Sequence, residues 1–229
     1  MNGFLFFEHD RMKKLILLLL VSFSINAWSQ AEFSLATDLS VLRNLNKGQE
    51  FWTIGQTVKG NFHFTDKTAG YVWLSYYGKG NFTTTSVAEA KSAFTVPQFI
   101  NYSVRSSVRY RQVSVGLKRY FKGTYNFEAV NIYGYAGFGL MLGKVDNVFR
   151  ADIDTTRYTI QPPLQGSGKF NRLTFDAGLG TEYPVAPDIY IYSELRTWIP
   201  SSGFPSQYLH NNNNVPSILA FNIGARLLF

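Results

Sequence analysis

A period-two alternation of apolar and other residues, repeated along nearly the whole chain, is the feature that most limits the fold of this sequence. Between residues 189 and 199, for example, Ile189, Ile191 and Leu195 alternate with Tyr, Glu and Arg residues. Successive side chains of a β-strand point to opposite faces, so this period predicts strands with one apolar face. Eight such segments can be counted, at residues 33–41, 52–64, 71–80, 103–121, 132–143, 172–183, 189–199 and 219–229. The pattern predicts an all-β fold of antiparallel strands.

The composition agrees with strands and excludes several other classes of protein. Aromatic residues make up 17% of the 229 residues and charged residues only 16%, a balance rich in strand formers. The mean hydropathy of -0.08 excludes a bundle of membrane helices, because each helix would need about 20 consecutive apolar residues. The sequence has no Cys, which excludes disulfides, thiolate metal sites, a Cys nucleophile and a lipid-modified Cys.

The N-terminal residues have the pattern of a secretory signal peptide. A Lys-Lys pair precedes an apolar run at residues 15–23, and Ala and Ser residues suitable for cleavage follow. We therefore expect a signal peptide over residues 1–29, with the true start at Met12, and a mature chain over residues 30–229. The net charge of +7 suits either nucleic acid or anionic lipid headgroups. Export favours the lipid surface and predicts no nucleic-acid partner.

The distribution of polar residues distinguishes a membrane barrel from a soluble β-sandwich or lipocalin-like barrel, which would also alternate. One face is apolar in segment after segment, while the other carries Gly, Tyr, Ser, Thr and paired charges, as inside a transmembrane barrel. Short connections also alternate with longer ones, as in such barrels. The short ones lie at 65–70, 122–129 and 184–188, and the others at 43–50, 83–102, 144–170 and 200–216. The expected fold is a closed up-and-down transmembrane β-barrel of eight antiparallel strands.

Three segments resemble a known family. The last segment, with Phe221, Ile223, Ala225, Leu227 and Phe229 at every second position, resembles the signal that outer-membrane proteins present to the barrel assembly machinery. The Gly-rich segments 133–139 and 177–184 are similar to strands of the outer-membrane β-barrel domain family of Bacteroidota, small barrels related to the OmpA and OmpX group. The resemblance implies an outer-membrane location and the assembly machinery as a partner, but no particular function. Because the chain ends inside its last strand, we expect no peptidoglycan-binding domain of the OmpA kind.

The residues that the alternation places inside the expected barrel include charges of both signs, in a narrow interior. The charged residues are Asp38, Lys59, Lys118, Arg172, Asp176, Glu182, Glu194, Arg196 and Arg226. The interior of an eight-stranded barrel is just wide enough for side chains to fill, so we expect a salt-bridged plug, with a small conductive path or a ligand cavity as the alternative. A tight turn centred near Ala186 would place Asp176 opposite Arg196, which predicts an ion pair between them.

No set of residues in the sequence indicates catalysis. His63 and His210 are the histidines of the expected mature chain, and neither stands in a nucleophile motif such as G-x-S-x-G. Asp146, Asp152 and Asp154 lack the spacing and the Gly of an EF-hand loop. We therefore expect no enzyme activity, no cofactor and no metal site.

A run of arginines precedes the apolar stripe of segment 103–121. Arg105, Arg109 and Arg111 come before Val113, and Arg109 and Arg111 share the parity of the stripe. The alternation changes phase near Arg111, which predicts a bulge or an extension beyond the bilayer. A lipid-facing Arg is costly at the bilayer midplane but not at the interface, so we expect these arginines at headgroup height, in contact with lipopolysaccharide phosphates. Solvated charges on an extramembrane strand are the alternative.

The expected function is a structural or interaction role. The barrel would bind a partner through its loops, or serve as an accessory subunit of an envelope complex, because long outer connections are present and a catalytic set is not. The expected partners are outer-membrane lipid and lipopolysaccharide, the assembly machinery and another envelope protein. A lipid-modifying enzyme or a narrow transport barrel is the alternative.

Overall fold

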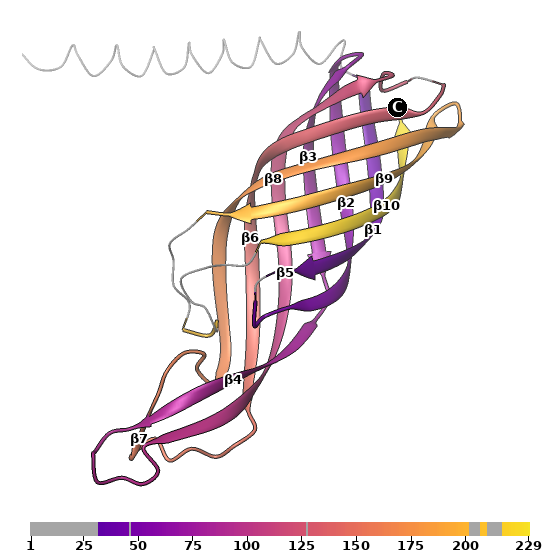
Figure 1. Cartoon of the computed structure of the whole chain (residues 1–229). Coiled ribbons are helices and arrows are strands. Elements are labelled where there is room, and N and C mark those ends of the chain that lie inside the picture. Colours follow the sequence, from indigo (N-terminus) through magenta and orange to yellow (C-terminus); the bar gives the residue numbers. More distant parts are fainter. Residues whose placement is uncertain (1–31, 46, 127, 202–206, 210–216) are drawn as a thin grey trace, which may run out of the picture.

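The computed structural model of the chain describes residues 32–45, 47–126, 128–201, 207–209 and 217–229 (Figure 1). The expected signal peptide and His210 lie outside these residues. The strands are β1 (Glu32–Asn44), β2 (Phe51–Thr65), β3 (Thr68–Tyr77), β4 (Gly80–Ala90), β5 (Phe99–Lys122), β6 (Asn131–Phe149), β7 (Tyr158–Ile160), β8 (Gly166–Ala186), β9 (Ile189–Pro200) and β10 (Ile218–Leu228). No helix within the described ranges is long and apolar enough to cross a membrane.

Eight of these strands form a closed antiparallel barrel, which confirms the predicted fold class (Figure 1). Neighbours pair in the order β1, β2, β3, β5, β6, β8, β9 and β10, and β10 then pairs with β1. The wall is continuous because β3 pairs with β5. Closure satisfies the backbone groups that an open sheet edge would expose to the membrane interior. The short turns between β2 and β3, β5 and β6, and β8 and β9 lie at one end, which we call the turn end.

Strand β5 keeps one phase through its 24 residues, which corrects the expectation of a phase change near Arg111. The sequence pattern changes there because inward residues such as Val108 and Tyr110 are apolar, whereas the inward residues nearer the turn end are polar. The irregularity lies in the partner strand. Tyr76 is opposite Arg111 and Gly80 is opposite Val108, so the segment from β3 to β4 has one residue more than β5. The predicted extension of β5 beyond the barrel is present.

The extension forms an arm at the end of the barrel opposite the turn end (Figure 1). The arm, as we use the term, consists of β4, residues 99–108 of β5, and β7, which pairs with the far end of β4. Its own small core consists of Ala88, Tyr102, Val104, Ile153 and Tyr158. The expected loops at 83–102 and 144–170 are therefore partly strand, because their backbone pairs beyond the barrel wall.

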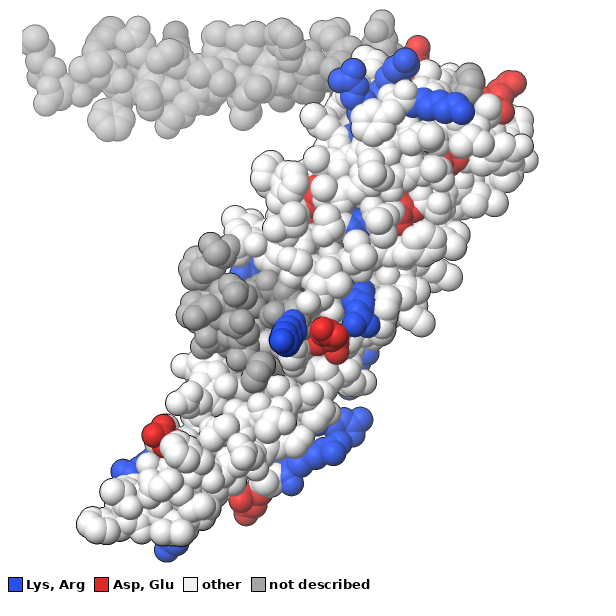
Figure 2. Space-filling view, viewed as in Figure 1, with Lys and Arg blue, Asp and Glu red and all other residues white. Residues whose placement is uncertain are grey.

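The barrel has an apolar outer surface between two more polar ends. Large apolar side chains such as Leu39, Ile54 and Phe138 point outward and are 69%, 70% and 70% exposed. Figure 2 shows charged side chains gathered near the turn end and again towards the arm, with mostly uncharged surface between them. Soluble monomers rarely expose an apolar patch larger than a few hundred Å². The outer surface therefore requires a lipid environment.

Candidate functional site: the charged lumen and the basic outer row

All nine charged residues expected in the lumen lie inside the barrel, each less than 5% exposed. In the described part of the chain, they are also the complete set of buried Asp, Glu, Lys and Arg residues. Four are carboxylates and five are cations. Because an unpaired buried charge costs several kcal/mol, the pairing of these groups decides whether the interior is stable.

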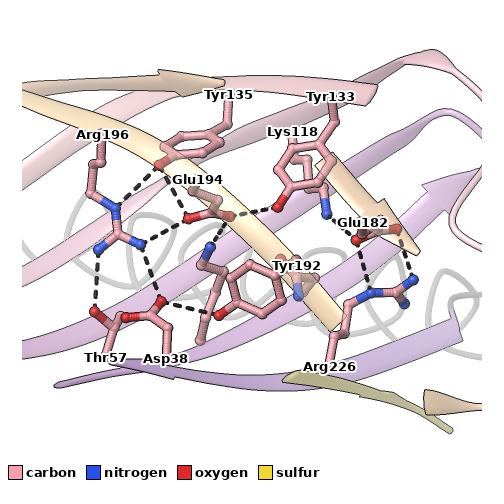
Figure 3. A network of polar contacts seen from close by, with 12 residues as sticks. Asp38, Thr57, Lys118, Tyr133, Tyr135, Glu182, Tyr192, Glu194, Arg196 and Arg226 are labelled. Atoms are coloured by element: carbon pink, nitrogen blue, oxygen red, sulfur yellow. Dashed lines mark hydrogen bonds and ion pairs between the residues drawn. The ribbon is translucent and has the colours of Figure 1, made fainter. Parts of the chain in front are cut away.

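Glu194 is the centre of the larger cluster (Figure 3). Its Oε1 atom accepts hydrogen bonds from the Lys59 ammonium at 2.5 Å and from the Tyr133 hydroxyl at 2.9 Å. Its Oε2 atom accepts from the Arg196 guanidinium at 3.0 Å and from the Tyr135 hydroxyl at 3.3 Å. Both oxygens of this buried carboxylate are therefore satisfied, each by one cation and one phenol.

Arg196 connects Glu194 to a second carboxylate (Figure 3). Its Nη2 atom lies 3.0 Å from Glu194 and 3.5 Å from Asp38. Asp38 also accepts a hydrogen bond from the Tyr192 hydroxyl at 3.0 Å. Together with Lys59, the cluster holds two cations and two carboxylates. Its charges therefore balance without any ion from solvent.

A second cluster surrounds Glu182 (Figure 3). Glu182 lies close to the end of β8 at the turn end. Arg226 donates from Nε and Nη2 to the two carboxylate oxygens, at 3.2 and 2.9 Å. Lys118 donates at 3.2 Å and Tyr120 at 2.8 Å. The Lys118 ammonium also lies 3.5 Å from the centre of the Tyr133 ring, a cation–π contact. Because Tyr133 also bonds the first cluster, the two clusters form one network.

Asp176 does not pair with Arg196, so the expected ion pair is wrong. Gly178 lies opposite Arg196 in the register of β8 and β9, because the pairing of these strands is centred at residue 187 and not at Ala186. Asp176 is satisfied by neutral donors from β5 and its own strand: Ser114, Gln112 and Thr174. Its charge is held by hydrogen bonds and not by a neighbouring cation.

Two glycines of β8 make room for the tyrosines that bond Glu194. A Cβ atom at Gly178 would lie 2.3 Å from the Tyr135 ring, and one at Gly180 would lie 2.6 Å from the Tyr133 ring. Both distances are far below van der Waals contact, so any side chain here would displace a phenol. The Gly-rich pattern of this strand is a packing requirement of the lumen.

Apolar side chains close the lumen towards the arm. Arg172 lies at this level, opposite Met141, where it donates to the Asn171 carbonyl at 2.7 Å and lies 5.8 Å from the Phe170 ring. The surrounding apolar cluster contains Leu42, Phe51, Tyr77, Val108, Tyr110, Met141, Val145, Phe170, Trp198, Leu209, Ile218 and Ala220. The charged network and this apolar cluster follow one another along the interior, from the turn end to the arm.

His63 makes a serine contact, but the contact lacks the geometry of a triad. Its Nε2 atom is 2.9 Å from the Ser34 hydroxyl, and its ring stacks on Tyr125 at 4.4 Å between centroids. Among the described residues, Nδ1 has no hydrogen-bond partner, so no acid orients the ring. In the same part of the chain, no three His, Cys, Asp or Glu residues gather to hold a metal ion. The pair gives no support to catalysis.

Outward-facing cations gather where the apolar outer surface ends towards the arm. Arg109 of β5 lies opposite Lys144 of β6, and Lys144 lies opposite Lys169 of β8. Together with Arg111 they line one hollow of the outer surface. We call these four residues the basic row. Arg105, which the sequence analysis placed with Arg109 and Arg111, lies four residues farther along β5, within the arm.

The sequence analysis missed the two lysines of the basic row. Lys144 and Lys169 fell in the expected loop 144–170, whereas both lie in strands, on β6 and β8. The available signal was the parity of Lys144, which continues the outward series after Leu140. That signal reveals an outward cation but does not place it beside Arg109, because strand register is required for that step.

The last strand closes the barrel between β1 and β9. The alternate residues of the expected assembly signal face outward, and Phe229 stacks against Phe33 of β1 with ring centroids 6.2 Å apart. The Phe229 amide also donates to the Phe33 carbonyl at 2.9 Å. These contacts hold the closing seam together at the turn end. Recognition of this strand by the assembly machinery stays a prediction.

Comparisons with known proteins agree with this architecture. Residues 15–229 match the outer membrane protein β-barrel domain family, whereas no curated protein matches the chain. The structure is similar to that of neisserial surface protein A, with a TM-score of 0.56, 12% identity and coverage of 87% of this chain and 99% of that chain. It also matches Ail, the attachment invasion locus protein of Yersinia pestis (TM-score 0.48, 13% identity, 87% and 99% covered). A further match is the N-terminal barrel domain of Pseudomonas aeruginosa OprF (TM-score 0.47, 12% identity, 87% and 100% covered).

The likeness to neisserial surface protein A supports the fold alone at this level of identity. The family match extends over nearly the whole chain and includes every described strand. It agrees with the closed wall, the apolar outer surface and the filled polar interior. The chain belongs to the outer membrane protein β-barrel domain family, and its location is the outer membrane.

Proposed function

We propose that this protein is a plugged barrel with an interaction role, which binds another protein of the envelope or cell exterior through its arm. The observation that carries the proposal is the arm itself, in which wall strands continue past the barrel as a hydrogen-bonded sheet. Transmembrane barrels place their short turns in the periplasm and their long connections outside. The arm would therefore project from the cell surface.

The tip of the arm presents apolar side chains to solvent. Phe94 and Val96 are 95% and 87% exposed, and Phe99 at the start of β5 is 61% exposed. These residues lie beyond the strands of the wall, so lipid does not cover them in the proposed orientation. Exposed apolar groups that gather at one place mark binding surfaces more often than single scattered ones do. The tip fits an apolar patch on a partner protein.

Hydrogen bonds hold the tip in one conformation. The Gln98 side chain donates to the carbonyls of Ser92, Ala93 and Thr95 at 3.4, 3.0 and 2.6 Å. The Tyr158 hydroxyl of β7 donates to the Pro97 carbonyl at 3.0 Å. A preformed binding surface loses less conformational entropy on association than a flexible loop does. This order supports a docking role for the arm.

The interior supports a plug and gives no support to transport. Seven of its nine buried charges are paired within the network of Glu194 and Glu182, and the apolar cluster around Trp198 lies between this network and the arm. An ion moving through would have to separate buried ion pairs, which costs several kcal/mol for each pair. An interaction role uses the arm and requires no path through the lumen.

A photoreactive amino acid at position 94 in living cells tests the proposal. Position 94 should form a cross-link to a partner protein, and Val96→Ser should remove that cross-link because it weakens the same apolar contact. Position 45 is the matched control, since Leu45 is also exposed but lies between β1 and β2, outside the arm. Equal cross-linking from both positions, or a cross-link that Val96→Ser does not change, would contradict the proposal. Heat-modifiable migration on gels would show that each variant is folded.

Five finer expectations belong to the same proposal. The signal peptide over residues 1–29, the Bacteroidota affiliation and the likeness to the OmpA group are consistent with a surface barrel of this kind. An accessory role in an envelope complex would be seen as co-purification of a second envelope protein that depends on the arm. Delivery to the membrane through the assembly machinery would depend on Phe229.

A further inference from the structure

We infer that the basic row, Arg109, Arg111, Lys144 and Lys169, is a binding site for the phosphate of a phosphorylated glycolipid in the outer leaflet. The site lies on the outer wall and is separate from both the lumen and the tip of the arm. The inference does not depend on a protein partner. It extends the sequence-based expectation from a run of arginines on one strand to a site built by three strands.

The basic row lies where the lipid-facing surface changes from apolar to cationic. On β5 the outward series passes from Val113 to Arg111 and Arg109, and on β6 it passes from Leu142 to Lys144. The change on β6 comes one outward position nearer the arm than the change on β5, because Arg111 is opposite Leu142 and Arg109 is opposite Lys144. Cations at this boundary meet headgroups, whereas the apolar residues on the turn-end side of the boundary meet acyl chains.

The strand register brings three cationic heads within reach of one anion. Side chains directly opposite on neighbouring strands have Cβ atoms about 5 Å apart. Arg109, Lys144 and Lys169 occupy three such adjacent positions, and Arg111 lines the same hollow. Like charges placed directly opposite one another are destabilising unless an anion lies between them. A phosphate in the hollow would remove this repulsion and accept hydrogen bonds from both kinds of cation.

One carboxylate supports the row without neutralising it. Asp146 lies 3.8 Å from Arg109 and 3.5 Å from Lys144, and it accepts a hydrogen bond from Ser167. The Ser167 hydroxyl and the nearby Lys144 lower the pKa of Asp146 below its usual value, so it is ionised at neutral pH. Four cations face this single carboxylate, which leaves an excess of three positive charges. Asp146 can position two of the cations while the row still attracts an anion.

The apolar lining favours a lipid over a free phosphate ion. The hollow includes Leu142 beside the cations. Leu140, Val113 and Leu173 continue the apolar outward surface from there towards the turn end. A glycolipid phosphate with acyl chains contacts both parts, whereas inorganic phosphate contacts the cations only. The burial of acyl chains against these residues would add about 0.8 kcal/mol for each buried CH₂ group. The chemistry of the whole surface therefore matches a phosphorylated lipid.

Binding of purified barrel to lipid A with and without its phosphates tests the inference. Lys144→Gln with Lys169→Gln should weaken binding of phosphorylated lipid A roughly tenfold, since two charge-assisted contacts are lost. The matched control is Arg119→Gln with Lys122→Gln, two exposed cations of β5 at the turn end, which should leave binding unchanged. Lys144→Arg with Lys169→Arg should retain most of the binding, because both charges remain.

Three results would overturn the inference. The first is that the Gln variant binds phosphorylated lipid A as tightly as wild type does. The second is that wild type binds lipid A equally well after its phosphates are removed. Displacement of the lipid by millimolar inorganic phosphate would identify the free ion as the ligand instead. Heat-modifiable migration separates loss of the site from loss of the fold, and the Arg variant provides a second test if the Gln variant fails to fold.

Discussion

The ion pair of Lys59 and Glu194 allows the strongest test of the buried network. Lys59→Met leaves two carboxylates, Glu194 and Asp38, facing the single cation Arg196. Glu194→Gln leaves the opposite imbalance, with two cations and one carboxylate. The double variant restores the balance, because Arg196 and Asp38 remain as one pair 3.5 Å apart. The free energies of unfolding of these three variants and wild type form a double-mutant cycle.

The expected magnitudes follow from distance and burial. The Nζ atom of Lys59 and the Oε1 atom of Glu194 lie 2.5 Å apart, and the two side chains are 5% and 1% exposed. Their Coulomb attraction is about 7 kcal/mol at an effective dielectric constant of about 20, and desolvation offsets much of it. Breaking a buried pair costs about 3–5 kcal/mol, and the lower value applies here because Glu194 keeps Arg196 and two phenols. We expect about 3 kcal/mol for each single variant, about 4 kcal/mol for the double variant, and a coupling near 2 kcal/mol.

Equilibrium unfolding in urea, followed by Trp fluorescence in lipid vesicles, measures these energies. The exposed pair of Arg43 and Glu50 is the control, since its atoms lie 2.9 Å apart but its side chains are 33% and 50% exposed. The same cycle there should give a coupling of at most about 1 kcal/mol. If the Lys59 and Glu194 cycle gave a coupling no larger than this control, the lumen would be hydrated and the argument for a dry plug would be refuted.

Three further predictions concern packing, assembly and conduction. Gly178→Ala should destabilise the barrel by about 1–3 kcal/mol, because its Cβ would lie 2.3 Å from the Tyr135 ring. Gly60→Ala is the control and should change stability little, because its Cβ would meet no atom closer than 3.4 Å. The urea assay compares the two variants. Deletion of Phe229 should lower the amount of heat-modifiable barrel in outer-membrane fractions, and normal amounts would show that this residue is dispensable for assembly. Purified wild type in planar bilayers should show no stable conductance steps, and regular steps would favour the transport alternative.

The direction of each side chain was predictable from the sequence because it depends on a single strand. Successive residues alternate between the two faces, so parity alone assigned Glu194 and Arg226 to the interior and Ile223 to the exterior. The nine buried charges and the eight strands of the wall followed from the same rule. The composition of the two faces then indicated which side was the lipid side. No knowledge of neighbouring strands was needed for these predictions.

The partner of each side chain was decided by the tertiary structure, because pairing depends on the register between strands. A shift of two residues keeps every side chain on its face but changes what lies opposite, and so Asp176 faces Trp198 instead of Arg196. The arm required the pairing of β7 with β4, which are distant in sequence. The basic row required Lys144 and Lys169 to align with Arg109 across three strands. Parity is local and readable from one segment, whereas register is the result of turns, bulges and packing summed over the closed wall.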